Sequence, residues 1–180
     1  MENNRSFLLM KESLTYIGIF LLYLVLGACH RDQTTIPEPG VSLELAAERK
    51  AIIKNLQYDL YFHLPADKKE PVRGKVNVHF TLEQAKPVVL DFWEGEGSVK
   101  KVEINGQEAR CQVVNEHILL APQLIRTGVN GISIDFIASD QSLNRNEDYL
   151  YTLLVPDRAR TLFPCFDQPD LKAIYALELD

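Results

Sequence analysis

Few residues in this sequence have the types and spacing that metal chemistry requires. The four histidines are His30, His63, His79 and His117, and no two of them are four positions apart. A pair at that spacing on a helix would place two imidazoles on one face, ready to bind zinc. His63 and His79 fall on the polar faces of two neighbouring predicted strands and could lie opposite each other, but no third ligand accompanies them. We expect both to be solvated surface residues and expect no metal site in this chain.

Two pairs of carboxylates have the spacing of a catalytic acid and base, namely Asp167 with Asp170 and Glu147 with Asp148. Both pairs lie among turn-forming residues, where such side chains hydrogen-bond to nearby backbone N–H groups. Turn and capping functions are the better interpretation. The sequence therefore predicts no catalytic residue and no cofactor-binding residue.

Cys29 stands at the end of a segment with the layout of a bacterial lipoprotein signal peptide. Positive charges at Arg5 and Lys11 are followed by an apolar run over residues 16–26 and by small residues just before the cysteine, which resembles a lipobox. We expect residues 1–28 to be removed and the Cys29 thiol to receive the lipid. The protein would then be exported and lipid-anchored to the bacterial cell envelope.

A permanent membrane span is the alternative for this segment. The apolar run is only about a dozen residues long, whereas a helix needs roughly 20 to cross a bilayer. The signal peptide is therefore preferred.

Two further cysteines, Cys111 and Cys165, lie outside any metal-type spacing. They could form a disulfide in an oxidising compartment, but sequence alone cannot establish the pairing. Two buried free thiols are the preferred interpretation.

The composition, with 46% hydrophobic and 24% charged residues, is that of an ordinary globular domain. The net charge is -6, and acidic and basic residues are interspersed rather than collected into blocks. No basic face is predicted, so we do not expect nucleic acid as a partner.

The first elements after Cys29 are a tether and a helix. Residues 29–41 are polar, contain Pro37 and Pro39 and show no periodicity, which predicts a tether. Ser42 could cap a helix over residues 43–54, where apolar residues recur at helical spacing.

From residue 56 the hydrophobic period changes to two. Alternating apolar and polar residues predict strands over 56–64 and 76–82 that pair as a hairpin. Asn105-Gly106 predicts a tight hairpin turn, because both residues tolerate positive φ. Further strand-like runs lie at residues 88–92, 99–104, 111–114, 117–120, 132–138 and 173–180. These patterns predict a mainly β fold, an antiparallel sandwich or saddle of sheets, preceded by one short helix.

The most specific motif follows a polar stretch over residues 139–148, which predicts a loop, and an apolar run over 149–155. Residues 160–169 read Arg-Thr-Leu-Phe-Pro-Cys-Phe-Asp-Gln-Pro. This resembles the aminopeptidase N family of zinc peptidases, in which an arginine precedes Phe-Pro-Cys-Phe-Asp-Glu-Pro, with Gln168 in place of the glutamate. Similar short motifs precede it in the order of that family's first domain, at Tyr58-Asp59-Leu60, Gly74-Lys75-Val76, Ile104-Asn105-Gly106 and Gly128-Val129-Asn130. The resemblance covers about residues 42–180.

The motif also has a physical interpretation of its own. Two prolines and two aromatic residues would fix and pack a non-helical path, and Arg160 and Asp167 could form an ion pair that holds it. A purely structural loop is an equally good interpretation.

The resemblance implies an amino-terminal β-domain that roofs the active-site cavity of a catalytic domain, expected after Asp180. In relatives that later domain binds zinc through H-E-x-x-H and a distant glutamate, and a G-x-M-E-N loop supports the substrate. Neither motif occurs in this chain. Zinc and peptide substrates would therefore belong to the parent enzyme, and this chain, a domain truncated at its C-terminal end, should be inactive alone.

Many relatives use a polar pair of this first domain to bind the free amine of the substrate. Counting back from the motif, the equivalent positions are Leu153 and Val155, and apolar side chains cannot accept a hydrogen bond from an ammonium group. Either another domain binds the amine, or the specificity differs, or the register of this alignment is shifted. We assign no substrate-binding residue.

Three functions follow from these observations. The first is the non-catalytic β-domain of a membrane-tethered zinc aminopeptidase that removes N-terminal residues from peptides. The second is a stand-alone lipoprotein that binds or scaffolds a partner without catalysis. The third is a protein with the shape of the peptidase and no activity.

Overall fold

The computed structural model describes residues 36–180. The expected signal peptide, the lipid acceptor Cys29 and the first part of the expected tether lie outside these residues. Over the described range, no helix is both long enough and apolar enough to cross a membrane.

The helix α2 spans Leu43–Ile52 and begins where the sequence predicted. Ser42 is its N-cap, because the Ser42 hydroxyl accepts a hydrogen bond from the Leu45 N–H at 3.1 Å. Glu44 in the first turn and Arg49 in the last turn complement the helix dipole. The helix ends two residues before the predicted boundary, because the first strand already begins at Ile53.

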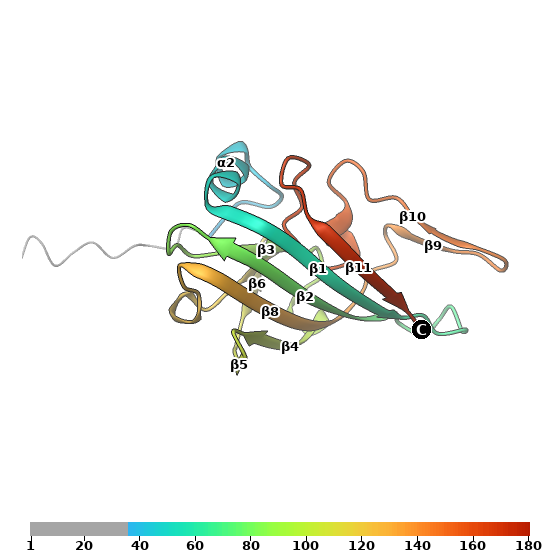
Figure 1. Cartoon of the computed structure of the whole chain (residues 1–180). Helices are drawn as coiled ribbons and strands as arrows, with labels where there is room; N and C mark the ends of the chain where they lie inside the picture. Colours follow the sequence, from blue (N-terminus) through green and yellow to red (C-terminus); the bar gives the residue numbers. More distant parts are fainter. Residues whose placement is uncertain (1–35) are drawn as a thin grey trace, which may run out of the picture. The chain divides into compact units, whose positions relative to one another are not determined.

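A six-stranded sheet forms the larger layer of the domain (Figure 1). Its strand order is β11-β1-β2-β8-β4-β5. The bounds are β1 Ile53–His63, β2 Arg73–Leu82, β4 Val99–Ile104, β5 Gln107–Glu108, β8 Gly128–Ile137 and β11 Ile174–Leu179. Buried and exposed residues alternate along β1 and β2, so the predicted hairpin with one apolar face is confirmed.

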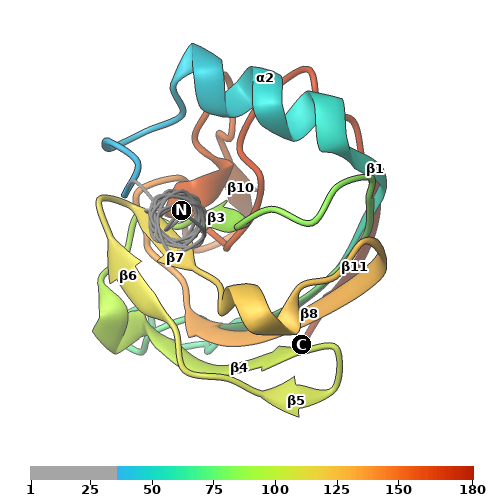
Figure 2. The ribbon, with the colours of Figure 1, turned by 90° about the vertical axis from the view of Figure 1, so that its left-hand side faces the viewer.

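Two smaller sheets complete the fold. One has the order β3-β7-β6, and the other pairs β9 with β10. Their bounds are β3 Val89–Asp91, β6 Gln112–Val114, β7 His117–Leu119, β9 Leu143–Arg145 and β10 Leu150–Thr152. Figure 2 shows the large sheet curving around β3 and β7, with α2 beyond β3. The mainly β sandwich with a preceding helix is confirmed.

The core lies between the large sheet and the β3-β7-β6 sheet. Phe136 of β8 meets Phe92 edge-on at a centroid distance of 5.7 Å and Phe62 of β1 at 5.9 Å. Gly74 of β2 lies directly over this ring, because a Cβ there would be 2.3 Å from Phe136 Cζ. A glycine is therefore required for the ring to lie against the strand.

The hairpin turn at Asn105-Gly106 is confirmed. These two residues join β4 to β5 with φ angles of 52° and 79°. The left-handed backbone conformation of both residues matches the twist of the two strands. Asparagine and glycine adopt this conformation most easily.

Two features differ from the sequence-based expectations. The chain forms a strand, β9, within the segment expected to be a polar loop, because Leu143 is buried and its strand pairs with β10. The last strand, β11, runs parallel to β1, with Leu60 opposite Leu177 and Phe62 opposite Leu179. A long connection separates β1 from β11, so no hairpin turn forces them to be antiparallel.

Candidate functional site

The segment that carries the sequence motif runs through the interior of the domain. After the short 3-10 turn η3, Ala159–Thr161, every residue from 161 to 168 is buried. Cys165 exchanges two backbone hydrogen bonds with Asp91 of β3, with N···O distances of 2.7 and 3.1 Å. This bridge attaches the motif segment to the smaller sheet.

The two aromatic residues of the motif pack against the large sheet. Phe163 meets Tyr58 edge-on at 6.3 Å, and Phe166 meets Phe80 at 5.7 Å. The Phe166 N–H also donates to the Tyr58 hydroxyl at 2.9 Å. Each such aromatic pair contributes about 0.5–1.5 kcal/mol beyond the burial of its surface. The expectation that these residues pack a fixed, non-helical path is confirmed.

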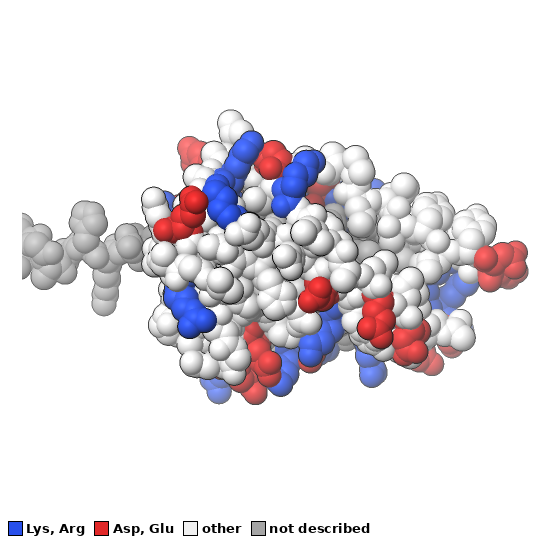
Figure 3. Space-filling view, viewed as in Figure 1, with Lys and Arg blue, Asp and Glu red and all other residues white. Residues whose placement is uncertain are grey.

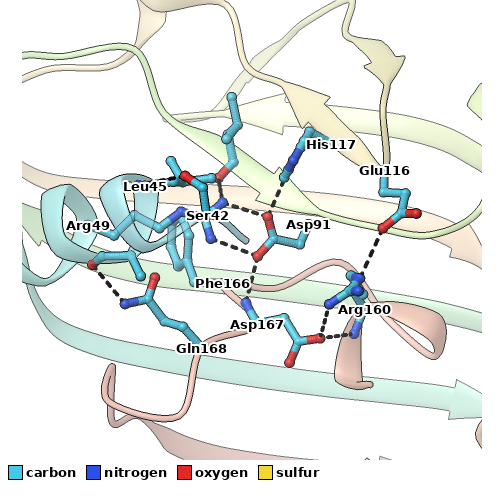
Figure 4. A network of polar contacts seen from close by, with 12 residues as sticks. Ser42, Leu45, Arg49, Asp91, Glu116, His117, Arg160, Phe166, Asp167 and Gln168 are labelled. Atoms are coloured by element: carbon cyan, nitrogen blue, oxygen red, sulfur yellow. Dashed lines mark hydrogen bonds and ion pairs between the residues drawn. The ribbon is translucent and has the colours of Figure 1, made fainter. Parts of the chain in front are cut away.

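Asp91 is the centre of a buried polar network that joins α2, β3, β7 and the motif segment (Figure 4). Arg49 of α2 donates to both of its carboxylate oxygens, at 2.6 and 2.7 Å. His117 of β7 places Nδ1 2.9 Å from Oδ1, and the Asp167 N–H donates to Oδ2 at 2.8 Å. The Asp91 and His117 side chains have no exposed surface.

The pKa of Asp91 reflects two opposed effects. Burial would raise this pKa, because a low-dielectric interior disfavours the charged form. Hydrogen bonds from His117 and Arg49, together with the guanidinium charge, outweigh burial and hold the pKa of Asp91 below its ordinary value. Asp91 is therefore an ionised carboxylate whose charge is neutralised inside the protein. Removing one partner of such a network leaves an uncompensated buried charge.

Arg160 holds the start of the motif segment. Its Nη1 lies 3.4 Å from Asp167 Oδ2 and 3.3 Å from Asp157 Oδ2, and its Nε lies 3.2 Å from Glu116 Oε2. The expected ion pair with Asp167 is confirmed. Asp167 also accepts the backbone N–H of Arg160 at 3.1 Å, which is the turn-capping function expected of it. Burial, with the nearby charge of Asp91, raises the pKa of Asp167 despite these contacts.

Gln168 has an environment that suits an amide better than a carboxylate. Its Nε2 donates to the Ala46 carbonyl of α2 at 3.0 Å and to Asp170 Oδ1 at 3.0 Å. Asp170 in turn pairs with Lys50 at 2.9 Å. A glutamate at this position could donate neither bond and would lie beside a second carboxylate. Gln168, which stands where the resembling motif has a glutamate, therefore has hydrogen-bond acceptors around it that require an amide donor.

The two cysteines within the described range are both free. Cys165 is buried, as expected, and burial raises its pKa well above the ordinary value. Cys111 is only half-buried, so the expectation of a buried thiol is wrong for it, and partial burial raises its pKa as well. A thiol with a raised pKa is a poor nucleophile.

The histidines on the sheet are not opposite each other. His79 pairs with Gln57 across β1 and β2, whereas His63 pairs with Arg73, so the predicted juxtaposition is wrong. His63 Nδ1 instead lies 3.0 Å from Asp180 Oδ2, and His79 Nε2 lies 3.6 Å from Asp59 Oδ2. Across residues 36–180, no three side chains of His, Cys, Asp or Glu come together to hold a metal ion.

An uncovered apolar surface lies at the β11 edge of the sheet. Tyr175, Leu177 and Leu179 point to the same side of the sheet as the buried residues of β1, yet each of them is more than half exposed. Beside them is a groove of about 270 Å³. Its lining residues are Leu60, Phe62, Leu64, Leu143, Leu150, Tyr151, Thr152, Leu154, Leu162, Phe163, Leu177 and Leu179.

The surface next to the groove is apolar as well. Leu153 is 55% exposed and Val155 is 85% exposed. Tyr149 and Tyr151 stack at a centroid distance of 6.1 Å and are also exposed. Charged side chains of both signs are mixed over the face shown in Figure 3, without a large block of one sign. Extended apolar surfaces of this kind are typical of interaction sites.

Arg49, Asp91 and His117 could not be identified from the sequence as members of one network. The available signal was Asp91 itself, a charged residue within the apolar run Val88-Val89-Leu90-Asp91-Phe92. A charge inside a buried strand requires a partner, but nothing in the sequence names that partner.

Comparison with solved structures gives several proteins of similar fold. Native yeast LTA4 hydrolase has a TM-score of 0.62 at 20% identity, and the match covers 78% of this chain and 27% of the hydrolase. An M1 zinc metallopeptidase from Deinococcus radiodurans, bound to a Tyr-Ser-Ala substrate, has a TM-score of 0.59 at 20% identity, covering 71% of this chain and 32% of that one. This chain therefore spans about a quarter to a third of the length of these proteins.

Residues 36–180 have the fold of the amino-terminal β-domain of M1 zinc metallopeptidases. At this level of identity the likeness establishes the fold alone. No protein-family profile matches the sequence. No curated protein sequence matches it significantly.

Proposed function

We propose that this chain is the amino-terminal, non-catalytic β-domain of a zinc aminopeptidase. The observation that carries the proposal is the structural match, which covers most of this chain and only about a quarter to a third of each M1 zinc metallopeptidase. The motif at residues 160–169 supports it, because it resembles that family's motif and its residues 161–168 are buried within the domain. The substrates would be peptides whose N-terminal residues are removed.

The role of this domain would be to cover the active site of the enzyme rather than to take part in catalysis. The described residues do not fit a zinc site, since no suitable group of ligands comes together among them. We assign no catalytic step to them. The apolar surface formed by Tyr175, Leu177, Leu179 and the groove beside them would pack against the catalytic domain and exclude water there.

The lipid anchor is a separate proposal that rests on the sequence of residues 1–29. Cys29 would carry the lipid and hold the enzyme at the bacterial cell envelope. The test is metabolic labelling with a radioactive fatty acid. We expect label in the native sequence and none after Cys29→Ala, while label in both proteins or in neither would contradict the anchor.

The aminopeptidase proposal is tested on the protein purified from its native source in detergent. We expect it to release nitroaniline from aminoacyl-nitroanilides, and we expect a zinc chelator to abolish this release. A protein that carries the β-domain and stays inactive after addition of zinc would contradict the proposal.

A stand-alone binding module is the second candidate function. The groove of about 270 Å³ and the exposed apolar side chains around it favour this candidate, because they could accept a ligand or partner without any catalytic domain. A native protein of the size of this chain would support it.

A further inference from the structure

The leading segment, residues 37–40, is attached to the domain through two of its backbone carbonyls. Asn115 Nδ2 donates to the Pro37 carbonyl at 3.1 Å. The Glu38 carbonyl oxygen lies 3.0 Å from His117 Nε2. Asn115 belongs to the tight turn between β6 and β7, and His117 is the first residue of β7. One hairpin therefore holds this segment.

Both ring nitrogens of His117 face oxygen atoms that accept hydrogen bonds and do not donate them. Nδ1 lies 2.9 Å from the Asp91 carboxylate, and Nε2 lies 3.0 Å from the Glu38 carbonyl. A backbone carbonyl has no hydrogen to donate, and Asp91 is ionised. A neutral imidazole carries a single N–H, so one of its nitrogens would place a lone pair against an oxygen lone pair. The imidazolium form, with an N–H on each nitrogen, satisfies both contacts.

We propose that His117 is a buried imidazolium that latches the leading segment to the domain, and that loss of its proton to solvent releases Glu38. The remaining N–H stays with Asp91, because a hydrogen bond to a carboxylate is stronger than one to a neutral carbonyl. The contact with Glu38 then becomes repulsive. Only the bond between Asn115 and Pro37 continues to hold the segment.

Several charged groups surround the His117 ring and affect whether it keeps its second proton. The negative charge of Asp91 on β3 favours the imidazolium form of His117. The positive charge of Arg49 on α2, which binds the same carboxylate, disfavours that form. Glu116, in the turn beside His117, and Asp167 of the motif segment are each paired with Arg160. A guanidinium keeps its proton at any pH at which the protein is folded, so His117, and not Arg49, is the group of this network that can release one.

The test is nuclear magnetic resonance of the full 180-residue chain in detergent micelles, with ¹⁵N in the histidine rings and ¹³C at the backbone carbonyls. At about pH 5, below the range in which histidine loses its charge, we expect both His117 ring nitrogens to carry hydrogen. As the pH rises, the ring should lose one hydrogen. The Glu38 carbonyl signal should then shift with the same midpoint.

Internal controls separate the latch from a general effect of pH. His63 and His79 are half-exposed, and changes in their ring signals should not be accompanied by a shift of the Glu38 signal. Asn115→Ala removes the bond to Pro37 and should leave the His117 ring doubly protonated at low pH. A single ring N–H at low pH, or a ring that keeps both hydrogens until the domain unfolds, would overturn the proposal. A Glu38 signal that stays constant while His117 titrates would overturn it equally.

Discussion

Asp91 accepts hydrogen bonds from Arg49, His117 and the backbone of Asp167, so three elements depend on one buried carboxylate. We expect Asp91→Asn to lower the free energy of unfolding by about 3–5 kcal/mol, because it leaves a buried guanidinium without its counter-charge. Urea unfolding of the chain at neutral pH measures the loss. Asp59→Asn is the matched control, since this carboxylate is 56% exposed and should contribute less than about 1 kcal/mol.

The same residue gives a pH dependence with a definite sign. The pKa of Asp91 is lowered on folding, so its contribution is fully present above the unfolded pKa of about 3.9 and is lost as the pH falls through the lower folded pKa. The pKa of Asp167 is raised on folding, so this residue adds stability as the pH falls and partly offsets the loss from Asp91. The native chain should therefore lose more stability than Asp91→Asn between neutral and acidic pH. Parallel pH profiles for the two proteins would show that Asp91 is not ionised inside the fold.

Gln168 offers a second test at this scale. Gln168→Glu should destabilise the chain by about 1–3 kcal/mol, because the Ala46 carbonyl loses its donor and a carboxylate is placed beside Asp170. Gln107→Glu, on the exposed strand β5, makes the same chemical change where no such partner exists and should have little effect. Equal unfolding midpoints for these two variants would contradict the interpretation of the motif.

Residue chemistry was only partly predictable from the sequence. The pair formed by Arg160 and Asp167 was foreseen because the two residues lie seven positions apart within one motif. The pair formed by Arg49 and Asp91 was not, because 42 positions separate them and only the packing of α2 on β3 brings them together. Partners of a buried charge that are distant in sequence leave no local signal.

Among the elements, β2 and β8 meet where Gly74 lies against the Phe136 ring. We expect Gly74→Ala to lower the free energy of unfolding by about 1–3 kcal/mol, because the new methyl group would overlap the ring and the core would have to shift. Gly95→Ala is the control, since nothing lies within 4 Å of its added Cβ. A tolerated substitution at Gly74 would show that the ring can move away from the strand at little cost.

The positions of the strands along the sequence were largely predictable, whereas the pairing between strands was not. Period-two hydrophobicity located β1, β2 and β8, and Asn105-Gly106 located the turn between β4 and β5. The parallel pairing of β11 with β1 was missed, because an alternating pattern is the same for either direction. The strand β9 was missed because it has only three residues and lies in a polar stretch.

For the whole molecule, the proposed function requires the catalytic domain to pack against the exposed side of β11. Leu177 is 61% exposed, so Leu177→Arg should change the unfolding free energy of the chain itself by less than about 0.5 kcal/mol. In the whole enzyme the same charge would be buried at the interface, and the thermal stability of the aminopeptidase activity should fall. Val129→Arg, at a side chain that is 69% exposed on β8, is the matched control. Equal effects of the two variants on the whole enzyme would contradict docking at β11.

The claim that this β-domain belongs to a larger zinc peptidase is tested most directly by the intact mass of the native protein, extracted in detergent and mapped by tryptic peptides. We predict a mass several times the 20.5 kDa of this chain, with peptides from a domain that carries H-E-x-x-H in the same polypeptide as Asp180. A native protein no larger than this chain, without such peptides, would contradict the claim and leave a stand-alone binding module.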